Sequence, residues 1–260
     1  MSSLRLSVTL PQIVLGLPAK NVENPYLAAP SGSARVEVNY KEGCQGFTAA
    51  GVPQEVAVRL HDFWSKLAAG LELNGCLSLS LLSTEGRPPP SSLYASLTVA
   101  VLHAVARSHS DVLDEYEIVE MGRMSDPWEG PNWWQGAIDA MRFCSATGNS
   151  VAYRNDEEAI ELAKLRVSTS HEASEVVGEG ASAEELGESV YDAFIHAIGQ
   201  AVLEASDEVR SGSSPSQAAL KRSRVQNSVA YLLYGVRPPE GHCVWVPGLP
   251  GVLELVCING

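Results

Sequence analysis

The segment that most constrains the fold runs from Ser91 to Ala106, where apolar residues fall on nearly every side of a helix. Three consecutive prolines, Pro88, Pro89 and Pro90, end the strand before it and fix its start. A helix that is apolar all round must be surrounded by other elements. We therefore expect it in the middle of a folded domain, and 260 residues, 45% of them apolar, are enough to build one.

Alternation of apolar and polar residues predicts strands on both sides of that helix. The expected strands cover residues 4–10 with a continuation over 12–17, 35–40, 77–81, 150–153, 165–169, 242–246 and 252–258. Turn residues predict a loop over residues 25–33. Helical spacing predicts helices over residues 56–71, 133–145, 156–163, 186–209 (after a capping box at Ser182 and Glu185) and 217–233, and a strand or short helix over 114–121. This order predicts an α+β architecture in two lobes, residues 1–150 and 151–260.

Charge and cysteine usage exclude several classes of partner. Eighteen basic against 31 acidic residues give a net charge of -13, which repels nucleic acids and anionic membranes. The longest apolar stretch, Leu93 to Val105, is too short to span a bilayer, and residues 1–10 do not resemble a signal peptide, so we expect a cytoplasmic protein. Five scattered cysteines without a CxxC pair predict neither a disulfide framework nor a zinc cluster, and we interpret them as small buried apolar residues.

The start of the buried helix is the first candidate for chemistry. Its hydroxyl residues Ser91, Ser92 and Ser96 lie where the first N–H groups of a helix lack partners and the helix dipole favours an anion. A phosphate held here would use backbone donors and hydroxyls, which suits a chain poor in lysine and arginine. The alternative is that Ser91 or Ser92 is merely the N-cap.

The segment from Trp128 to Asp139 is the second candidate, because it holds three of the five tryptophans. A glycine-containing turn that opens a helix can present a carboxylate to a ligand, so Asp139 is a candidate general base. Arg142 follows three residues later on the same helical face. The alternatives are that Asp139 complements the helix dipole or pairs with Arg142, and that the tryptophans are core or the interface of a homodimer.

The turn from Pro247 to Gly251, between two apolar strands, is the third candidate. Its glycines would let the backbone approach a ligand closely. A plain hairpin turn explains them equally well.

In order and spacing these segments resemble the GHMP kinase superfamily, the group of galactokinase, homoserine kinase, mevalonate kinase and phosphomevalonate kinase. The segments that carry the resemblance are residues 11–16 and 25–29 at the opening motif, 90–100 at the phosphate loop, 136–140 at the aspartate segment, 165–170, and 248–255 at the third motif. The resemblance implies a two-lobed fold, with an N-terminal ribosomal-protein-S5-like lobe and a C-terminal ferredoxin-like lobe.

The resemblance also implies a site for ATP, Mg²⁺ and a small-molecule substrate. It makes Asp139 the catalytic base, adds Arg142 as a catalytic cation, and places Mg²⁺ near Glu129 and Ser96. The nucleotide-binding residues that it implies are Ser91, Ser92, Tyr94, Ser96, Gly248 and Gly251. The expected activity is phosphoryl transfer from ATP to an alcohol of a mevalonate-like hydroxy acid.

Two departures from the family pattern support an alternative function. Gln12 stands where mevalonate-type members have a lysine, and residues 90–96 lack the glycines that let backbone amides wrap a triphosphate. A non-catalytic relative that kept the fold for binding or assembly is therefore the alternative to the kinase. An ATP-dependent decarboxylase of the same fold is a third hypothesis. Its diphosphate substrate calls for lysines or arginines near the site, and this acidic chain has few obvious candidates.

Overall fold

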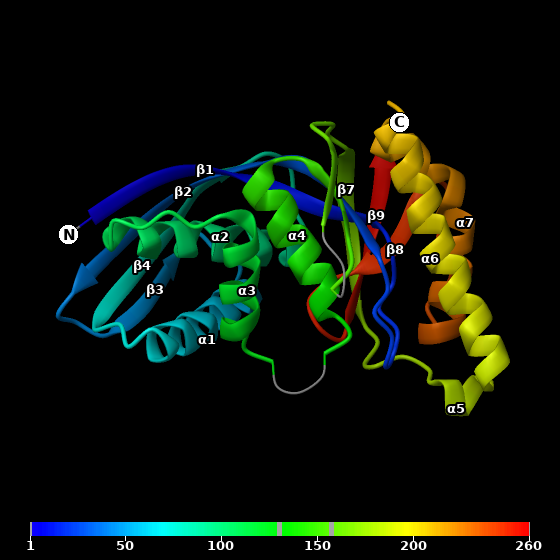
Figure 1. The fold of residues 1–260 in the computed structure, drawn as a ribbon, viewed down its shortest axis with the longest axis horizontal. Helices are drawn as coiled ribbons and strands as arrows, with labels where there is room; N and C mark the ends of the chain where they lie inside the picture. The colour runs from blue at the N-terminus through cyan, green and yellow to red at the C-terminus, as the bar shows by residue number, and fades with distance from the viewer. Residues whose placement is uncertain (1, 129–131, 156–158, 260) are drawn as a thin grey trace.

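The computed structural model describes residues 2–128, 132–155 and 159–259, and it contains two β-sheets with helices packed beside them (Figure 1). The larger sheet has the order β3-β4-β2-β5-β6, with β1 paired to β2. Its strands are β1 (Ser2–Leu15), β2 (Tyr26–Glu42), β3 (Gly46–Ala50), β4 (Gly75–Thr84), β5 (Ser150–Tyr153) and β6 (Ile160–Ala163). The smaller sheet has the order β7-β9-β8, formed by β7 (Ser168–Val176), β8 (Cys243–Pro247) and β9 (Val252–Asn259).

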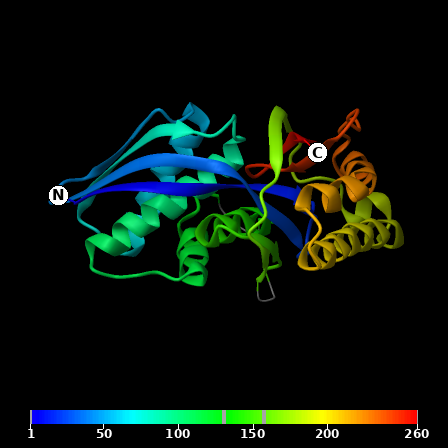
Figure 2. The same ribbon diagram turned by 90° about the horizontal axis from the view of Figure 1, so that it is seen from above.

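The helices form two groups, one beside each sheet (Figures 1 and 2). The group beside the larger sheet consists of α1 (Gln54–Gly70), α2 (Pro90–Ser108), α3 (Glu115–Ser125) and α4 (Gln135–Thr147). The group at the other end consists of α5 (Ala183–Leu186), α6 (Glu188–Arg210) and α7 (Pro215–Tyr234). This arrangement confirms the predicted α+β class. Within the described ranges, no helix combines the length and the apolar character that crossing a bilayer requires.

Helix α2 is the buried helix that the sequence predicts. Its residues are buried without interruption from Ser91 to Leu102, and it contacts α1, α3, α4, β1 and β2. Pro90 stands in its first turn, where a missing N–H leaves no hydrogen bond unmade. Because neighbours surround α2 on all sides, its first turn lies in the interior of the protein.

The prediction of a loop over residues 25–33 is wrong, because β2 begins at Tyr26 and includes the rest of this segment. The register of β1 on β2 shifts just after Leu10, opposite the segment 30–32. Ser31 is the extra residue of this bulge, and its Oγ donates to the carbonyl oxygen of Leu10 at 3.0 Å. Proline and glycine are tolerated at a bulge, so these turn residues mark a distortion within a strand.

The helix predicted over residues 156–163 is also wrong where the structure describes it. Residues 156–158 lie outside the described ranges, and the rest of the segment contains β6, which pairs with β5. A strand of four residues is too short for periodicity to separate it from a helix. Residues 114–121 fall in α3, the helical one of the two forms expected there.

The predicted capping box and the predicted end of the last helix are both present. The capping box of Ser182 and Glu185 is present, but it caps the single turn α5 and Gly187 separates this turn from α6. Gly235 ends α7 in the left-handed conformation. Strand β5 begins at Ser150 and pairs with β2, so the larger sheet continues past the lobe boundary expected near residue 150, and that boundary stays a prediction.

Four of the five cysteines form disulfides, which corrects the expectation that they are unpaired apolar residues. Cys44 pairs with Cys76, and Cys243 pairs with Cys257. Cys243 and Cys257 are direct cross-strand partners on β8 and β9. The pairing depends on sheet register, which no local pattern in the sequence reports. Cys144 is free and buried, as predicted.

We expect the chain, unfolded without a reductant, to expose the thiol of Cys144 alone, and to expose all five thiols after reduction. The disulfides close loops of 32 and 14 residues, so reduction should also lower the free energy of unfolding by about 3 kcal/mol per bond. Thiol titration and urea denaturation measure the two effects. Five titratable thiols in the unreduced chain would show that the cysteines are unpaired.

Candidate functional site

The first turn of α2 binds a carboxylate from the chain itself. The backbone N–H of Ser91 donates to Oε1 of Glu254 at 3.1 Å, and the Ser91 hydroxyl donates to Oε2 at 2.5 Å. Glu254 lies on β9 and is fully buried. The N-cap is Pro89, which has no capping side chain, so Glu254 satisfies donors that the helix start leaves open. The position that the resemblance assigns to a nucleotide phosphate is therefore filled by a glutamate.

The turn between β8 and β9 is shaped around this glutamate. A Cβ on Gly248 would lie 2.8 Å from the carboxyl carbon of Glu254, so the absence of a side chain makes room for the buried carboxylate. Gly251 has a φ of +80° and belongs to the same hairpin turn. Burial raises the pKa of Glu254 to about 7, while the hydrogen bonds from Ser91 favour the charged form and oppose that rise.

Of the other hydroxyls predicted at this helix start, those of Tyr94 and Ser96 donate to groups of the protein. Tyr94 donates to Oδ1 of Asp126 at 2.7 Å. Ser96 donates to the carbonyl oxygens of Thr9 and Ser92, both at 2.8 Å. The Oγ of Ser92 is buried and has no hydrogen-bond partner within the described part of the chain. The hydroxyl protons of Tyr94 and Ser96 are thus already engaged.

Asp139 and Arg142 form the ion pair that their spacing allows, with Nη1 and Oδ1 3.3 Å apart. A second carboxylate, that of Asp126 just after α3, accepts from both terminal guanidinium nitrogens of Arg142. Asp139 also accepts from Nε2 of Gln135 at 2.8 Å and from Nε of Arg123 at 2.9 Å. Both oxygens of Asp139 are therefore hydrogen bonded to protein, and its side chain has no exposed surface.

Complete burial makes these charges depend on each other. Burial raises the pKa of Asp139 to about 6, and the two neighbouring arginines pull it back down. Burial also opposes the charge of Arg142, but Asp126, Tyr94 and Asp139 together outweigh burial and hold the pKa of Arg142 above the ordinary value. The rings of Phe63 and Tyr94 each lie with their centres 5.7 Å from the guanidinium carbon. This environment stabilises an internal ion pair and gives Asp139 no open path to a substrate.

In the tryptophan-rich segment, Trp134 belongs to the core, and Trp128 and Trp133 are partly buried against it. Nε1 of Trp128 donates to Oε1 of Gln135 at 2.6 Å, and its ring centre lies 5.5 Å from that of Tyr94. The ring of Trp134 packs against Tyr234 of α7, with centres 5.9 Å apart. Trp128 therefore covers the ion-pair network, and Trp134 joins α4 to α7.

Three residues that position these groups are missed by the sequence patterns. Glu254 leaves a signal, because it interrupts the apolar side of an alternating strand, between Val252 and Val256. Gly122 lacks a Cβ that would lie 2.8 Å from Nε of Arg142, and so makes room for the guanidinium. Asp126 follows the end of a helix and leaves no signal, because its partner lies on another element.

The residues present do not fit a nucleoside triphosphate with its metal. Glu254 holds the donors at the helix start, and Gln12, in the place of the family lysine, is buried and donates to the carbonyl of Ile13 at 3.1 Å. Of the two predicted metal ligands, Ser96 donates to backbone carbonyls and Glu129 lies outside the described residues. Among the described residues, no group of three or more His, Cys, Asp or Glu side chains could hold a metal ion.

We expect Asp126→Asn to destabilise the fold more than Asp139→Asn. Asp126 binds two nitrogens of Arg142, so the first variant leaves a buried guanidinium undercompensated, at a cost of about 3–5 kcal/mol. Asp139→Asn keeps that pair and should cost about 1–3 kcal/mol. Urea denaturation measures both. Adding Arg142→Met to Asp126→Asn should recover part of the loss, and a larger loss for Asp139→Asn would contradict this account.

Glu254 should make stability depend on pH. Its folded pKa of about 7 exceeds the ordinary value of 4.5, so between these pH values the folded state binds more protons than the unfolded state. The free energy of unfolding should therefore fall as pH rises through this window. Glu254→Gln should remove this contribution and be more stable than wild type above the window, by about 3 kcal/mol at most. If urea denaturation gives the same dependence of the free energy of unfolding on pH for wild type and Glu254→Gln, the raised pKa of Glu254 is refuted.

Comparison with known proteins gives matches among solved structures. No protein-family model and no curated protein sequence matches the chain. Mevalonate kinase from methicillin-resistant Staphylococcus aureus is 16% identical, with 100% of this chain and 92% of that chain covered and a TM-score of 0.56. Phosphomevalonate kinase from Streptococcus pneumoniae, in complex with phosphomevalonate and AMPPNP, is 11% identical, with 99% and 93% covered and a TM-score of 0.60.

Mevalonate diphosphate decarboxylase from Staphylococcus aureus matches equally well, at 10% identity, with 99% of this chain and 88% of that chain covered and a TM-score of 0.60. These three proteins differ in reaction and share one fold, so the likeness carries no information about which reaction, if any, this chain performs. The chain has the fold of the GHMP kinases.

Proposed function

We propose that this protein is a non-catalytic member of the GHMP kinase fold, which binds a ligand or partner and does not transfer phosphoryl groups. The observation that carries the proposal is the contact between Glu254 and Ser91 at the start of α2. It fills the anion position of the fold with a side chain that belongs to the protein.

The charge of Glu254 would oppose a nucleotide phosphate at the same place. Two unit negative charges 4 Å apart repel each other by about 4 kcal/mol at an effective dielectric constant of 20, a loss of roughly a thousandfold in affinity. The protonated form of Glu254 removes the repulsion but still occupies the space and the donors of Ser91. Nucleotide binding therefore requires Glu254 to leave a fully buried position.

The candidate catalytic residues support the same proposal. A general base must reach the proton of the attacking hydroxyl, either directly or through one water. Asp139 has no exposed surface and both its oxygens accept hydrogen bonds from protein. Arg142 is equally buried and is held by Asp126. Exposing either residue would break a buried ion pair, which is strongly unfavourable.

The second candidate is the ATP- and Mg²⁺-dependent kinase of a mevalonate-like hydroxy acid. The alignment over nearly the whole chain with a phosphomevalonate kinase bound to phosphomevalonate and AMPPNP favours it. It requires both the Glu254 contact and the Asp139 network to open. The cytoplasmic location expected from the sequence also stays a prediction, and the two disulfides weigh against it, because such bonds persist mainly in oxidising compartments.

We expect the wild-type chain to show no binding of ATP with MgCl₂ at millimolar concentration in isothermal titration calorimetry, and no phosphoryl transfer to mevalonate or phosphomevalonate. Glu254→Ala should gain measurable affinity for inorganic phosphate or ATP, because it frees the donors of Ser91. Glu254→Gln is the matched control, since it removes the charge and keeps the occupant, and it should gain less.

Two results would refute the proposal. One is submillimolar ATP binding by the wild-type chain. The other is turnover that disappears in Asp139→Asn while the variant stays folded by circular dichroism, because such a loss would place the carboxylate at the reacting atoms.

A further inference from the structure

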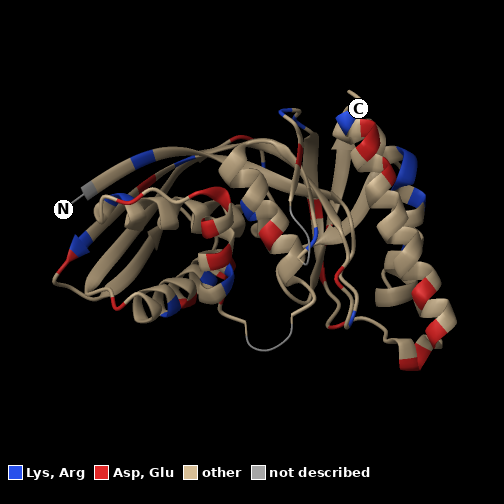
Figure 3. Cartoon of the chain, viewed as in Figure 1, with Lys and Arg blue, Asp and Glu red and all other residues tan. Residues whose placement is uncertain are grey.

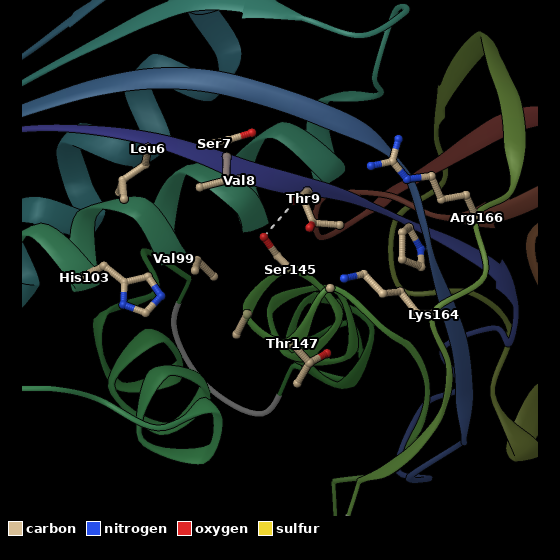
Figure 4. Close-up of a pocket in the computed structure, with 13 residues that line it drawn as sticks. Leu6, Ser7, Val8, Thr9, Val99, His103, Ser145, Thr147, Lys164 and Arg166 are labelled. Atoms are coloured by element: carbon tan, nitrogen blue, oxygen red, sulfur yellow. Dashed lines mark hydrogen bonds between the residues drawn. The ribbon is translucent and has the colours of Figure 1, made fainter.

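A cavity of about 610 Å³ lies beside β1, apart from the buried contact at the start of α2 (Figure 4). This volume is typical of sites for small molecules. Its polar lining comes from four separate parts of the chain: Ser7 and Thr9 of β1, His103 of α2, Ser145 and Thr147 of α4, and Lys164 and Arg166 between β6 and β7. Val8, Pro30 and Val99 add apolar surface.

The segment that carries the two basic residues is fixed to the body of the protein. The Ser150 hydroxyl donates to the carbonyl oxygen of Leu165 at 3.0 Å, and the N–H of Val167 donates to the carbonyl oxygen of Pro30 at 2.8 Å. Val167 is buried, while Lys164 and Arg166 are exposed and alternate with these anchored residues. Figure 4 shows the Lys164 side chain extending toward the end of α4. The backbone therefore holds both cations at the rim of the cavity.

The charge of this lining is unusual for the chain. Acidic residues outnumber basic ones by 31 to 18, and Figure 3 shows them along α3, α5 and α6, yet no Asp or Glu of the described ranges lines the cavity. Arg166 pairs with Glu85 at 3.4 Å, but both side chains are more than half exposed and such pairs are weak. Lys164 forms no ion pair or hydrogen bond within the described ranges. Lys164 thus gives the cavity a positive charge for which the described part of the chain supplies no partner, and Arg166 adds a charge that is only weakly paired.

A structural role explains part of this arrangement. The last carbonyl groups of α4 carry partial negative charge and attract a nearby cation, which accounts for the direction of Lys164. This attraction does not account for Arg166 or for the size of the cavity. Burial lowers the pKa of His103 and so favours the neutral ring. A neutral imidazole has one nitrogen that donates and one that accepts a hydrogen bond.

We propose that this cavity binds a small organic oxyanion, a phosphate ester or carboxylate, whose charged group meets Lys164 and Arg166 and whose carbon skeleton lies against Val8 and Val99. The inference deepens the proposed function, because it names a ligand class for a protein that binds without catalysis. It uses a different part of the molecule from Glu254, so the two ideas fail independently.

The test is calorimetric titration of the full chain with glycerol 3-phosphate, citrate and inorganic phosphate at constant ionic strength. We expect saturable binding of at least one organic anion, and weaker binding of inorganic phosphate, which lacks a carbon skeleton. Lys164→Gln should weaken binding of that anion about tenfold or more, and Arg166→Gln should act in the same direction. Both side chains are exposed, so the variants should keep the wild-type melting temperature.

A matched control sharpens the test. Lys41→Gln removes the same charge from an exposed position outside the cavity, so it should bind the anion like wild type. No saturable binding of any probe at millimolar concentration would overturn the inference, as would equal losses in Lys41→Gln and Lys164→Gln. ATP turnover together with Lys164-dependent anion binding would refute the proposed function and leave this inference standing.

Discussion

The burial of a guanidinium group at the centre of the helices is the constraint on which the interior depends. Arg142 has no exposed surface, and a buried charge is tolerated when it is paired and hydrogen bonded. Asp126 supplies that pair from the end of α3, and Asp139 supplies a second carboxylate from α4 itself. Tyr94 of α2 binds the same Asp126. The network thus ties three helices together, and neither Arg142 nor Asp126 can be removed without leaving the other as a buried charge that lacks its main partner.

The same physical requirement acts at the start of α2. A buried helix terminus needs acceptors for its first N–H groups, and in a nucleotide-binding protein a phosphate can provide them. Here Glu254 accepts from the N–H and the hydroxyl of Ser91, and Gly248 leaves the space that the glutamate needs. Both places that the resemblance assigns to chemistry are therefore filled by internal contacts. This is why we propose binding without catalysis: Ser91 and Asp139 are already held by groups of the protein, which a nucleotide would have to displace.

How far the sequence predicts this structure depends on how local each feature is. The burial of α2 and the end of α7 at Gly235 follow from periodicity and turn chemistry in one segment, and both are confirmed. The strand through residues 30–32 and the disulfides depend on sheet register, which a single segment does not encode. At the site, Ser91 and Asp139 could be singled out, but the partner of Ser91 lies 163 residues away. Sequence patterns thus identify the polar groups but do not predict which hydrogen-bond partners they have in the folded protein.

The distribution of compensated charge indicates where ligand binding can still occur. In the interior, Arg142 is matched by Asp126 and Arg123 by Asp139, so an incoming ion would have to compete with a preformed partner. At the cavity beside β1, Lys164 is exposed, and an oxyanion that replaces water there breaks no ion pair between that lysine and the described residues. The net charge of -13 makes anion binding unfavourable over most of the surface and favours places where basic side chains outnumber carboxylates. An uncompensated cation in an acidic protein is therefore a stronger indication of a site than the buried aspartate that the kinase resemblance brings forward.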